Sequence, residues 1–359
     1  MKTVTVNVGS SGYDIIIGPG LLSQTGDHLS RLGFSNKVTI VTDATVRKLY
    51  GGILEQALVA SGFEVTTLSG ADSEEEKSLE TAGRLYLELT DFYAERGTPV
   101  LALGGGVTGD LTGFVAATYQ RGVPLIQIPT TLLAQADSSL GGKTAVNHGR
   151  LKNRIGAFYQ PSLTISDIDT LKSLSQRQLA DGLAEIIKHG AIQDAAFFEY
   201  LEDNIEGILA LDNETLETTV ARSAEIKAAI VEQDELDLGL RNILNYGHTI
   251  GHAIETVSNF QIDHGRAVAI GMLVAARISN RMGLLGRSDV SRLKKLLNRV
   301  GLLAETPELD TDKLIEAMHH DKKIVGGRIK FVLLESIGEV IVTDDVDLNL
   351  VKKVLSEKL

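Results

Sequence analysis

Cysteine and tryptophan are both absent from this sequence of 359 residues. The lack of cysteine excludes disulfides, thiolate metal sites, iron–sulfur clusters and cysteine nucleophiles, so any metal must be held by His, Asp or Glu side chains. Also absent is a run of about 18 apolar residues, which a membrane-spanning helix would need. The first residues lack the apolar core of a signal peptide, and we therefore expect a cytoplasmic protein.

Positive charge is in short supply as well. The chain has 35 Lys and Arg residues against 47 Asp and Glu residues, which gives a formal net charge of −12. This acidic balance disfavours nucleic acid and anionic membranes as partners. At about 150 residues per domain, the length predicts two domains.

Short β-rich runs alternate with helical patterns in the first half of the chain. We expect strands at residues 4–8, 13–17, 37–41, 63–68, 99–103 and 124–128, with helices at 44–60, 77–96 and from the following glycines to 119. This alternation predicts a parallel sheet covered by helices on both faces. The sequence thus indicates an α/β domain over residues 1–176.

The second half is predicted to be mainly helical. Helical patterns cover residues 176–192, 195–202, 214–232, 240–258, 265–282 and 288–300, and short strands are expected at 329–334 and 339–342. We therefore expect a second, mainly α-helical domain over residues 177–359, with the boundary near residues 174–178.

A glycine-rich turn follows the strand predicted at 99–103. Gly104, Gly106 and Gly109 match the spacing G-x-G-x-x-G, which lets backbone N–H groups approach a pyrophosphate. The match is incomplete, because the usual fingerprint lies in the first βα unit and has an acid about 20 residues later. We favour a nucleotide diphosphate site of a non-standard type over a tight turn used only for packing. Asp43 is placed either to bind a ribose hydroxyl or to cap the following helix.

A basic segment stands out in this acidic chain. Residues 138–160 contain Lys143, Arg150, Lys152 and Arg154 and no carboxylate, a local charge of +4. The segment is not a Walker A loop, because Asp137 stands where the first glycine would be. An anionic small molecule is favoured as its ligand over the alternative, an ordinary solvated loop.

Histidines and glutamates gather in the helical half. His248 and His252 are four residues apart on one predicted helix face, Glu255 follows on the same side, and His264 comes shortly after. Glu185 lies three residues before Lys188. Two imidazoles and a carboxylate suit Zn²⁺ with one open coordination position, although the alternative is a set of structural residues.

Five stretches together are far more specific than any one of these motifs. They are residues 104–110 (GGGVTGD), 129–147 (PTTLLAQADSSLGGKTAVN), 152–158, 184–188 (AEIIK) and 244–255 (LNYGHTIGHAIE). In these the chain resembles the 3-dehydroquinate synthase family of sugar phosphate cyclases, from about residue 13 to residue 338. The resemblance implies an N-terminal Rossmann-like NAD-binding domain and a C-terminal helical domain that binds a metal.

The activity that the resemblance implies belongs to the shikimate pathway. It converts 3-deoxy-D-arabino-heptulosonate 7-phosphate to 3-dehydroquinate and phosphate, by transient oxidation with NAD⁺, phosphate elimination, re-reduction and an intramolecular aldol closure. The implied cofactors are NAD⁺ and one divalent metal, Zn²⁺ or alternatively Co²⁺. The implied assembly is a homodimer, and the substrate is a small anionic sugar phosphate.

The resemblance also implies roles for individual residues. The metal ligands are Glu185, His248 and His264, with His252 as an outer or proton-handling group. Arg121 is implied to reach the site from a second subunit, and one of Lys322 and Lys323 is implied to reach the phosphate. The residues implied to act on the substrate are Arg121, Asp137, Lys143, Asn153, Lys188, Lys227, Arg241, Asn245, His252, Lys322 and Lys323. The residues implied to bind NAD⁺ are Asp43, Asp72, Glu74, Lys77, Gly105, Gly106, Val107, Thr108, Gly109, Asp110, Thr130, Thr131, Lys143, Lys152, Thr170, Leu171, Lys172 and Ser173.

Some positions depart from the family pattern. The His-Gly-Glu that usually begins at the last metal ligand is His264-Gly265-Arg266 here, which exchanges an acid for a cation. Two alternative enzymes remain open, another sugar phosphate cyclase of the valiolone or inosose type and a metal-dependent polyol dehydrogenase. A third alternative is a non-catalytic NAD-binding protein.

Overall fold

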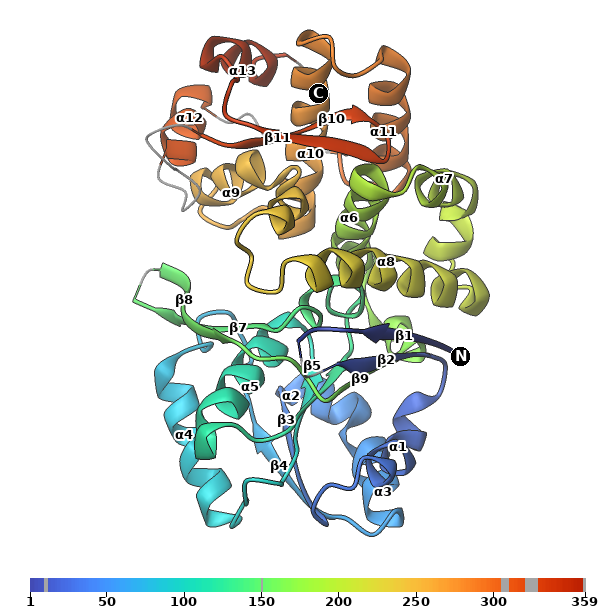
Figure 1. Ribbon diagram of the computed structural model, residues 1–359, viewed down its shortest axis with the longest axis vertical. Coiled ribbons are helices and arrows are strands. Elements are labelled where there is room, and N and C mark those ends of the chain that lie inside the picture. The colour runs from blue at the N-terminus through green and yellow to red at the C-terminus, as the bar shows by residue number, and fades with distance from the viewer. Residues whose placement is uncertain (10–11, 150, 305–309, 320–328, 358–359) are drawn as a thin grey trace. The chain divides into compact units, whose positions relative to one another are not determined.

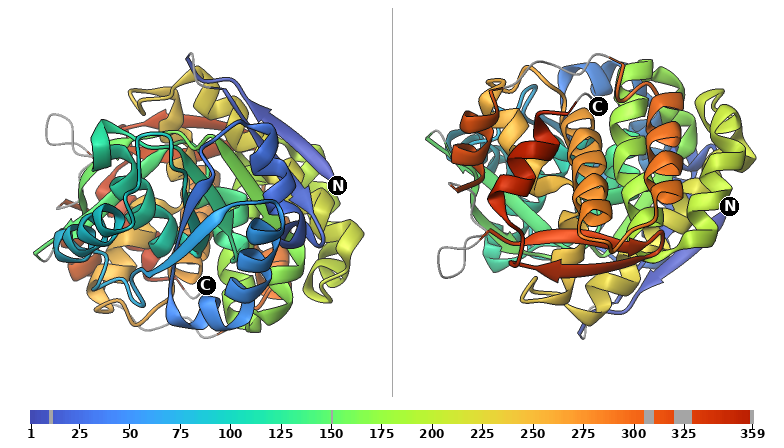
Figure 2. Two further views of the ribbon diagram at one scale, coloured as in Figure 1. Left: turned by 90° about the horizontal axis from the view of Figure 1, so that it is seen from below. Right: turned by 90° about the horizontal axis from the view of Figure 1, so that it is seen from above.

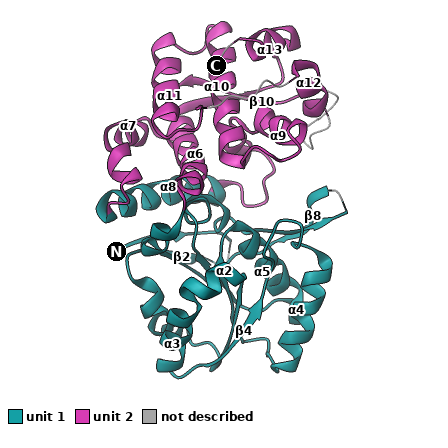
Figure 3. Cartoon of the chain, turned by 180° about the vertical axis from the view of Figure 1, so that it is seen from behind, with its two compact units in different colours: residues 1–174, 213–232 teal, residues 175–212, 233–359 magenta. Residues whose placement is uncertain are grey.

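The computed structural model describes residues 1–9, 12–149, 151–304, 310–319 and 329–357. Its chain forms two compact units (Figure 3): unit 1 comprises residues 1–174 and 213–232, and unit 2 comprises residues 175–212 and 233–359. The chain first passes from unit 1 to unit 2 after residue 174, two residues before the expected end of the first domain at residue 176. Helix α8 (Asn213–Gln233) groups almost entirely with unit 1, so the division is not the single cut that we expected.

Unit 1 is built on a seven-stranded sheet with the order β1–β2–β9–β6–β5–β3–β4. Strand β1 (Lys2–Val6) pairs antiparallel with β2 (Tyr13–Gly18), close to the two strands expected at residues 4–8 and 13–17. The other pairings are parallel and join β2, β3 (Lys37–Thr42), β4 (Glu64–Ser69), β5 (Val100–Gly104), β6 (Leu125–Pro129) and β9 (Leu163–Asp167). The predicted parallel sheet is therefore confirmed.

Helices cover both faces of this sheet (Figure 1). Successive residues of its strands point to opposite sides, so each face carries apolar side chains that the helices bury. Leu101 of β5 packs in the apolar cluster that contains Leu54 of α3 (Gly52–Ala60), beside α1 (Thr25–Arg31). Its neighbour Ala102 packs in the other cluster, with Leu111 of α5 (Gly106–Thr118) and the buried face of α4 (Leu79–Asp91). Short helical turns complete the unit: η1 (Leu21–Gln24), α2 (Ala44–Val46), η2 (Arg47–Gly51), η3 (Tyr119–Arg121), η4 (Ala134–Ser138) and η5 (Ile168–Ser173).

The basic segment forms structure that the sequence analysis did not predict. Strands β7 (Lys143–His148) and β8 (Leu151–Phe158) pair antiparallel as a separate two-stranded sheet. Most of β8 is exposed, so its side chains do not show the apolar alternation of a half-buried strand.

Unit 2 is mainly helical, as predicted. Its elements are α6 (Gln176–Gln193), α7 (Ala195–Leu209), η6 (Leu240–Asn245), α9 (His248–Val257), α10 (His264–Arg281), α11 (Arg287–Arg299), α12 (Thr311–His319), α13 (Leu348–Leu355), β10 (Phe331–Ser336) and β11 (Glu339–Thr343). The β10–β11 hairpin packs beside α10 (Figure 2). Among the described residues, no helix is both long and apolar enough to cross a membrane.

One predicted helix is broken in the structure. The pattern over residues 240–258 suggested a single helix, but the chain forms η6 and then α9, with Gly247 between them at φ 82°. A Cβ at Gly247 would lie 2.6 Å from Cγ of Met272 and 2.7 Å from the carbonyl oxygen of Val268 on α10. The glycine thus turns the chain with a left-handed backbone and lets α9 start directly against α10.

The space around a glycine predicts opposite effects for two Gly→Ala substitutions, one where α10 packs closely against α9 and one on α4. A Cβ at Gly271 of α10 would overlap the carbonyl oxygen of Gly247 and lie 3.0 Å from the amide nitrogen of Gly251. At Gly83 of α4, by contrast, no described atom lies within 4 Å of an added Cβ. Gly271→Ala should therefore destabilise the protein by about 1–3 kcal/mol through overpacking. Gly83→Ala should stabilise it by about 0.5–1 kcal/mol through helix propensity.

Urea unfolding followed by circular dichroism measures both effects in the full chain. Equal midpoints for the two variants would contradict the close approach of the helices at Gly271.

Candidate active site

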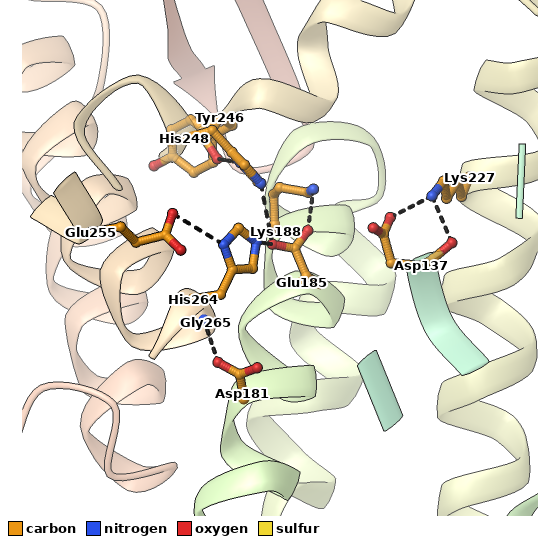
Figure 4. Close-up of polar contacts among 10 residues, drawn as sticks. All are labelled: Asp137, Asp181, Glu185, Lys188, Lys227, Tyr246, His248, Glu255, His264 and Gly265. Carbon is orange, nitrogen blue, oxygen red and sulfur yellow. Dashed lines mark hydrogen bonds and ion pairs between the residues drawn. The ribbon is translucent and has the colours of Figure 1, made fainter. Parts of the chain in front are cut away.

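Three side chains from three helices of unit 2 converge on one point (Figure 4). Glu185 lies in the middle of α6, whereas His248 and His264 are the first residues of α9 and α10. Glu185 Oε1 lies 3.4 Å from His248 Nε2 and 3.6 Å from His264 Nε2. One ligand atom from each residue falls within 4.8 Å of the others, a spacing that fits a metal ion.

The two imidazoles are oriented by their second nitrogens. His248 Nδ1 lies 3.2 Å from the carbonyl oxygen of Tyr246, and His264 Nδ1 lies 3.4 Å from Glu255 Oε2. Acceptors at both Nδ1 atoms favour the tautomer in which each Nε2 is available as a ligand. One carboxylate and two imidazoles with an open fourth position match the donor set of a catalytic Zn²⁺ or Co²⁺ site, so the residues present fit the metal.

Burial makes the charge of this cluster costly unless it is balanced. Glu185 is 1% exposed and accepts a hydrogen bond from the ammonium group of Lys188, which is 2% exposed. Burial lowers the pKa of His248 well below its usual value. Burial has the same tendency at His264, but the carboxylates of Glu185 and Glu255 outweigh it and raise the pKa of His264 to about 10. A metal would therefore replace a proton on His264.

His252 lies beside the cluster without being one of its three converging side chains. Its ring centroid is 5.3 Å from that of His248 and 6.3 Å from that of His264. This placement is consistent with the outer role expected of it, which stays a prediction.

The glycine-rich turn joins β5 to α5 in unit 1. Cβ atoms added at Gly104 and Gly109 would lie 2.5 Å from Thr108 Oγ1 and 3.0 Å from Gln127 Oε1, so these two glycines serve packing. Gly105 occupies the N-cap position of α5. Because it has no side chain, the first N–H groups of the helix receive no hydrogen bond from a capping side chain. An N-terminus of this kind suits a pyrophosphate. Thr130 donates its backbone N–H to the carbonyl oxygen of Gly104, at 2.9 Å, and Thr131 lies 3.3 Å from a Cβ added at Gly105.

A polar network lies near the same turn. Lys77 Nζ lies 3.1 Å from Asp110 Oδ2 and 3.2 Å from Glu74 Oε1. Asn147 of β7 donates to Glu74 Oε1 at 2.9 Å and accepts from the backbone N–H of Asn153 at 2.9 Å. Burial raises the pKa of Asp110 to about 6, against the opposing charge of Lys77. The network ties expected cofactor residues of α5 to the β7–β8 hairpin.

Asp43 and Asp72 have structural partners. Asp43 Oδ1 accepts from the backbone N–H of Val46 at 2.9 Å, and Asp72 Oδ1 accepts from that of Ala44 at 2.8 Å. The capping alternative for Asp43 is therefore confirmed, and the ribose contact stays a prediction. The expected contacts at Thr170, Leu171, Lys172 and Ser173 all fall in η5 and likewise stay predictions.

The expected substrate cations differ in their surroundings. In unit 1, Lys227 of α8 is 5% exposed and lies 2.8 Å from Asp137 Oδ1, with a second bond of 2.7 Å to the carbonyl oxygen of Asp137. In unit 2, Arg241 of η6 is 2% exposed and donates to the carbonyl oxygen of Glu235 at 3.1 Å. Asn245 ends the same turn, 3.5 Å from Asn242.

The remaining expected residues are on the surface or outside the description. Lys143, Lys152 and Asn153 are exposed on the β7–β8 hairpin, and Arg121 is exposed with φ 64° in a tight turn. Lys322 and Lys323 lie outside the described residues.

The sequence analysis missed two contacts that support the cluster of Glu185, His248 and His264. The carbonyl oxygen of Tyr246 lies beside His248 Nδ1, and the carboxylate of Asp181 accepts from the backbone N–H of Gly265, next to His264. The backbone contact at Tyr246 has no sequence signal. Asp181 lies four residues before Glu185 and therefore on the same face of α6, a signal that could have identified it.

Fold and site together define a class of protein: an α/β unit with a glycine-rich turn, and a helical unit that can hold one divalent metal. Residues 67–181 match the family model described as 3-dehydroquinate synthase N-terminal, and residues 182–324 match 3-dehydroquinate synthase C-terminal. A 3-dehydroquinate synthase from Dehalococcoides mccartyi is 48% identical over 346 residues, 96% of each chain. The chain belongs to the 3-dehydroquinate synthase family, as its motifs predicted.

Two solved structures of related cyclases share the whole fold. A 2-deoxy-scyllo-inosose synthase, complexed with carbaglucose-6-phosphate, NAD⁺ and Co²⁺, is 30% identical with a TM-score of 0.92 and covers 100% of both chains. A 2-epi-5-epi-valiolone synthase from Streptomyces hygroscopicus subsp. jinggangensis, with NAD⁺ and Zn²⁺ bound, is 29% identical with a TM-score of 0.88. That match covers 99% of this chain and 98% of the other. The predicted fold class, an α/β domain followed by a helical domain, is confirmed.

The cluster predicts that metal binding depends on Glu185 and His264. Glu185→Gln or His264→Ala should reduce Zn²⁺ retention after dialysis by about 100-fold or more, because each removes one of three ligands. The metal content of the purified full-length variants measures this loss. His28→Ala is the control, since His28 lies on α1 in unit 1, whereas the cluster belongs to unit 2. Normal metal content in both ligand variants would show that the metal is held elsewhere.

Proposed function

We propose that this protein converts 3-deoxy-D-arabino-heptulosonate 7-phosphate to 3-dehydroquinate and phosphate, with NAD⁺ and one divalent metal bound. The observation that carries the proposal is the convergence of Glu185, His248 and His264 in a chain that matches 3-dehydroquinate synthases over nearly its full length. The two cyclase structures with NAD⁺ and Co²⁺ or Zn²⁺ support the same cofactors here. The overall reaction is redox-neutral, so NAD⁺ is needed only in catalytic amount.

The cofactors supply chemistry that the side chains lack. When bound, NAD⁺ accepts and returns a hydride, and the metal polarises a substrate hydroxyl. Glu185, His248 and His264 hold the metal, while Tyr246 and Glu255 keep the two imidazoles turned toward it. In unit 1, the amides at Gly105 and Gly106 and the network of Lys77 and Asp110 bind NAD⁺. The remaining expected contacts, from Asp43 to Ser173, complete that site.

The substrate carries a carboxylate and a phosphate, and both require cations. Lys143, Lys188, Lys227 and Arg241 supply positive charge. Asp137, Asn153 and Asn245 orient hydroxyl groups, and His252 moves a proton. Lys227 and Arg241 are each at most 5% exposed. Burial would strengthen their attraction for a bound anion, because the effective dielectric constant inside a protein is lower than that of water. Lys152 contacts both cofactor and substrate, and one of Lys322 and Lys323 contacts the phosphate.

The active assembly is a homodimer in the cytoplasm. Arg121, exposed on the turn of η3, contributes its guanidinium to the phosphate site of a second copy of the chain. Its neighbours Gln120 and Gly122 also have positive φ angles, of 52° and 115°. Such a turn projects the arginine from the surface, where a second subunit can receive it.

Another sugar phosphate cyclase is the second candidate, favoured by the similarity to the inosose and valiolone synthases. A substrate without a carboxylate would not need every one of the groups that this chain has together. This argues for dehydroquinate synthase instead, and the set consists of Lys152, Asn153, Lys227, Arg241, Asn245 and His252. A polyol dehydrogenase would release NADH, unlike the proposed reaction.

An assay with two substrates distinguishes these candidates. The protein should release one phosphate per 3-deoxy-D-arabino-heptulosonate 7-phosphate, accumulate no NADH, and lose activity with EDTA until Zn²⁺ or Co²⁺ is restored. Sedoheptulose 7-phosphate, which lacks the carboxylate, should be a poor substrate. Turnover of sedoheptulose 7-phosphate alone would overturn the proposal, and steady accumulation of NADH from a polyol would favour the dehydrogenase.

Substitution of Lys227 tests the proposed substrate cations. Loss of one charged hydrogen bond costs about 1.5–3 kcal/mol, so Lys227→Met should lower kcat/KM by about 10–150-fold. The bound metal and NAD⁺ should be unchanged, because Lys227 belongs to neither set of expected ligands. Lys2→Met is the matched control, since Lys2 bonds to Thr218 on the same helix but is exposed. Full activity of Lys227→Met would remove Lys227 from the site.

A further inference from the structure

One face of α6 contacts three successive residues at the start of α10. Arg177, Asp181 and Glu185 are spaced four residues apart, so their side chains lie in one row along the helix. Arg177 Nη2 donates to Asp263 Oδ1 at 2.7 Å, Asp181 Oδ1 accepts from the backbone N–H of Gly265, and Glu185 faces His264. Three turns of α6 therefore meet the three residues that begin α10.

The first turn of α10 depends on α6 for its cap. Asp263 occupies the N-cap position, yet among the described residues its side chain accepts no hydrogen bond from that turn. The carboxylate of Asp181 takes over this role from the neighbouring helix by accepting the N–H of Gly265 (Figure 4). A helix start without an acceptor leaves buried N–H groups unsatisfied, so this contact has consequences for where α10 begins.

Gly265 makes the contact geometrically feasible. A Cβ on Gly265 would lie 2.6 Å from Asp181 Cα and 2.7 Å from Asp181 Oδ1, distances that real Cβ atoms do not show. The two backbones therefore approach each other more closely than any other residue at position 265 would allow. His264 precedes Gly265 in the chain, so the contact between Gly265 and Asp181 also fixes the position of the His264 backbone.

The contacts that Arg177 and Asp181 make with α10 differ in strength. The side chain of Arg177 is 71% exposed, and an exposed ion pair contributes little. Asp181 is half-buried, and its partner is a backbone N–H that cannot move without moving the helix. Asp181 is therefore the member of the row, apart from Glu185 itself, that can determine the position of His264.

We propose that Asp181 is a positioning residue for metal binding: by capping α10 at Gly265, it holds His264 Nε2 at the distance from Glu185 and His248 that one metal ion requires. This inference rests on the proposed function, since it takes these three residues as the ligands. Asp181 does not itself touch the metal. Outer partners of metal ligands typically change affinity by about 10–100-fold when removed.

The test measures metal affinity directly. Metal-stripped full-length protein, with NAD⁺ present, is titrated with Zn²⁺ against a fluorescent chelator, and Co²⁺ absorption reports the coordination geometry. Asp181→Ala should weaken Zn²⁺ binding by about 10–100-fold and alter the Co²⁺ spectrum. Asp181→Asn should stay within about threefold of the unsubstituted protein, because the amide oxygen still accepts the N–H of Gly265.

Asp194→Ala is the matched control. Asp194 caps α7 by accepting the backbone N–H of Phe197 at 3.0 Å, so this variant loses the same kind of bond in the same unit, nine residues beyond Glu185 along the chain. Its metal affinity should be unchanged even if its unfolding midpoint falls. If Asp181→Ala does not fold, Gly265→Ala tests the same contact, and it should weaken binding through the collision of its Cβ with Asp181.

The outcomes separate this inference from the proposed function. Equal losses in Asp181→Ala and Asp181→Asn would overturn it, because they would show that the charge and not the hydrogen bond matters. Unchanged affinity in Asp181→Ala, or in Gly265→Ala if that variant is used, would overturn it too. Failure of Glu185→Gln to weaken metal binding would instead contradict the metal site on which the proposed function depends.

Discussion

The buried carboxylate of Glu185 is the constraint on which unit 2 depends. A charged group that is 1% exposed must be compensated, and its surroundings provide one ammonium group and two imidazoles. These partners come from α6, α9 and α10, so satisfying one carboxylate requires three helices to meet at one point. A divalent ion at this point would be held by the same carboxylate and imidazoles, and it would take the place of the proton that the carboxylates of Glu185 and Glu255 favour on His264.

Small residues make that meeting of helices feasible. Gly247, Gly251 and Gly271 lie where α9 and α10 approach each other, and Gly265 lies where α10 approaches α6. Larger residues at these positions would separate the helices and move His248 or His264 away from Glu185. Packing and the geometry of the cluster are thus coupled in unit 2, because the close approaches that form its core also position the three converging side chains.

Unit 1 uses a different arrangement for its expected cofactor. A glycine turn at the carboxyl end of β5 leads into α5, and buried Lys77 connects the helix, through Asp110, to Glu74. Asn147 extends this network to the β7–β8 hairpin. The β7–β8 hairpin is basic although the whole chain has a net charge of −12. The network ties this hairpin to the helix that follows the glycine turn, so the basic segment is not a free loop.

The sequence by itself determined the fold class, the family and most of the parallel sheet, and it singled out Glu185, His248 and His264, the three side chains that converge in unit 2. These features are carried by local patterns and by motifs with characteristic spacing, such as His248 and the residues around it. The β7–β8 hairpin, the break at Gly247 and the grouping of α8 with unit 1 were decided only by the tertiary structure. So were the Nδ1 acceptors of the histidines and the cap that Asp181 provides to α10. These features join residues from different elements, and their energies depend on burial and on backbone approach, neither of which a linear pattern records.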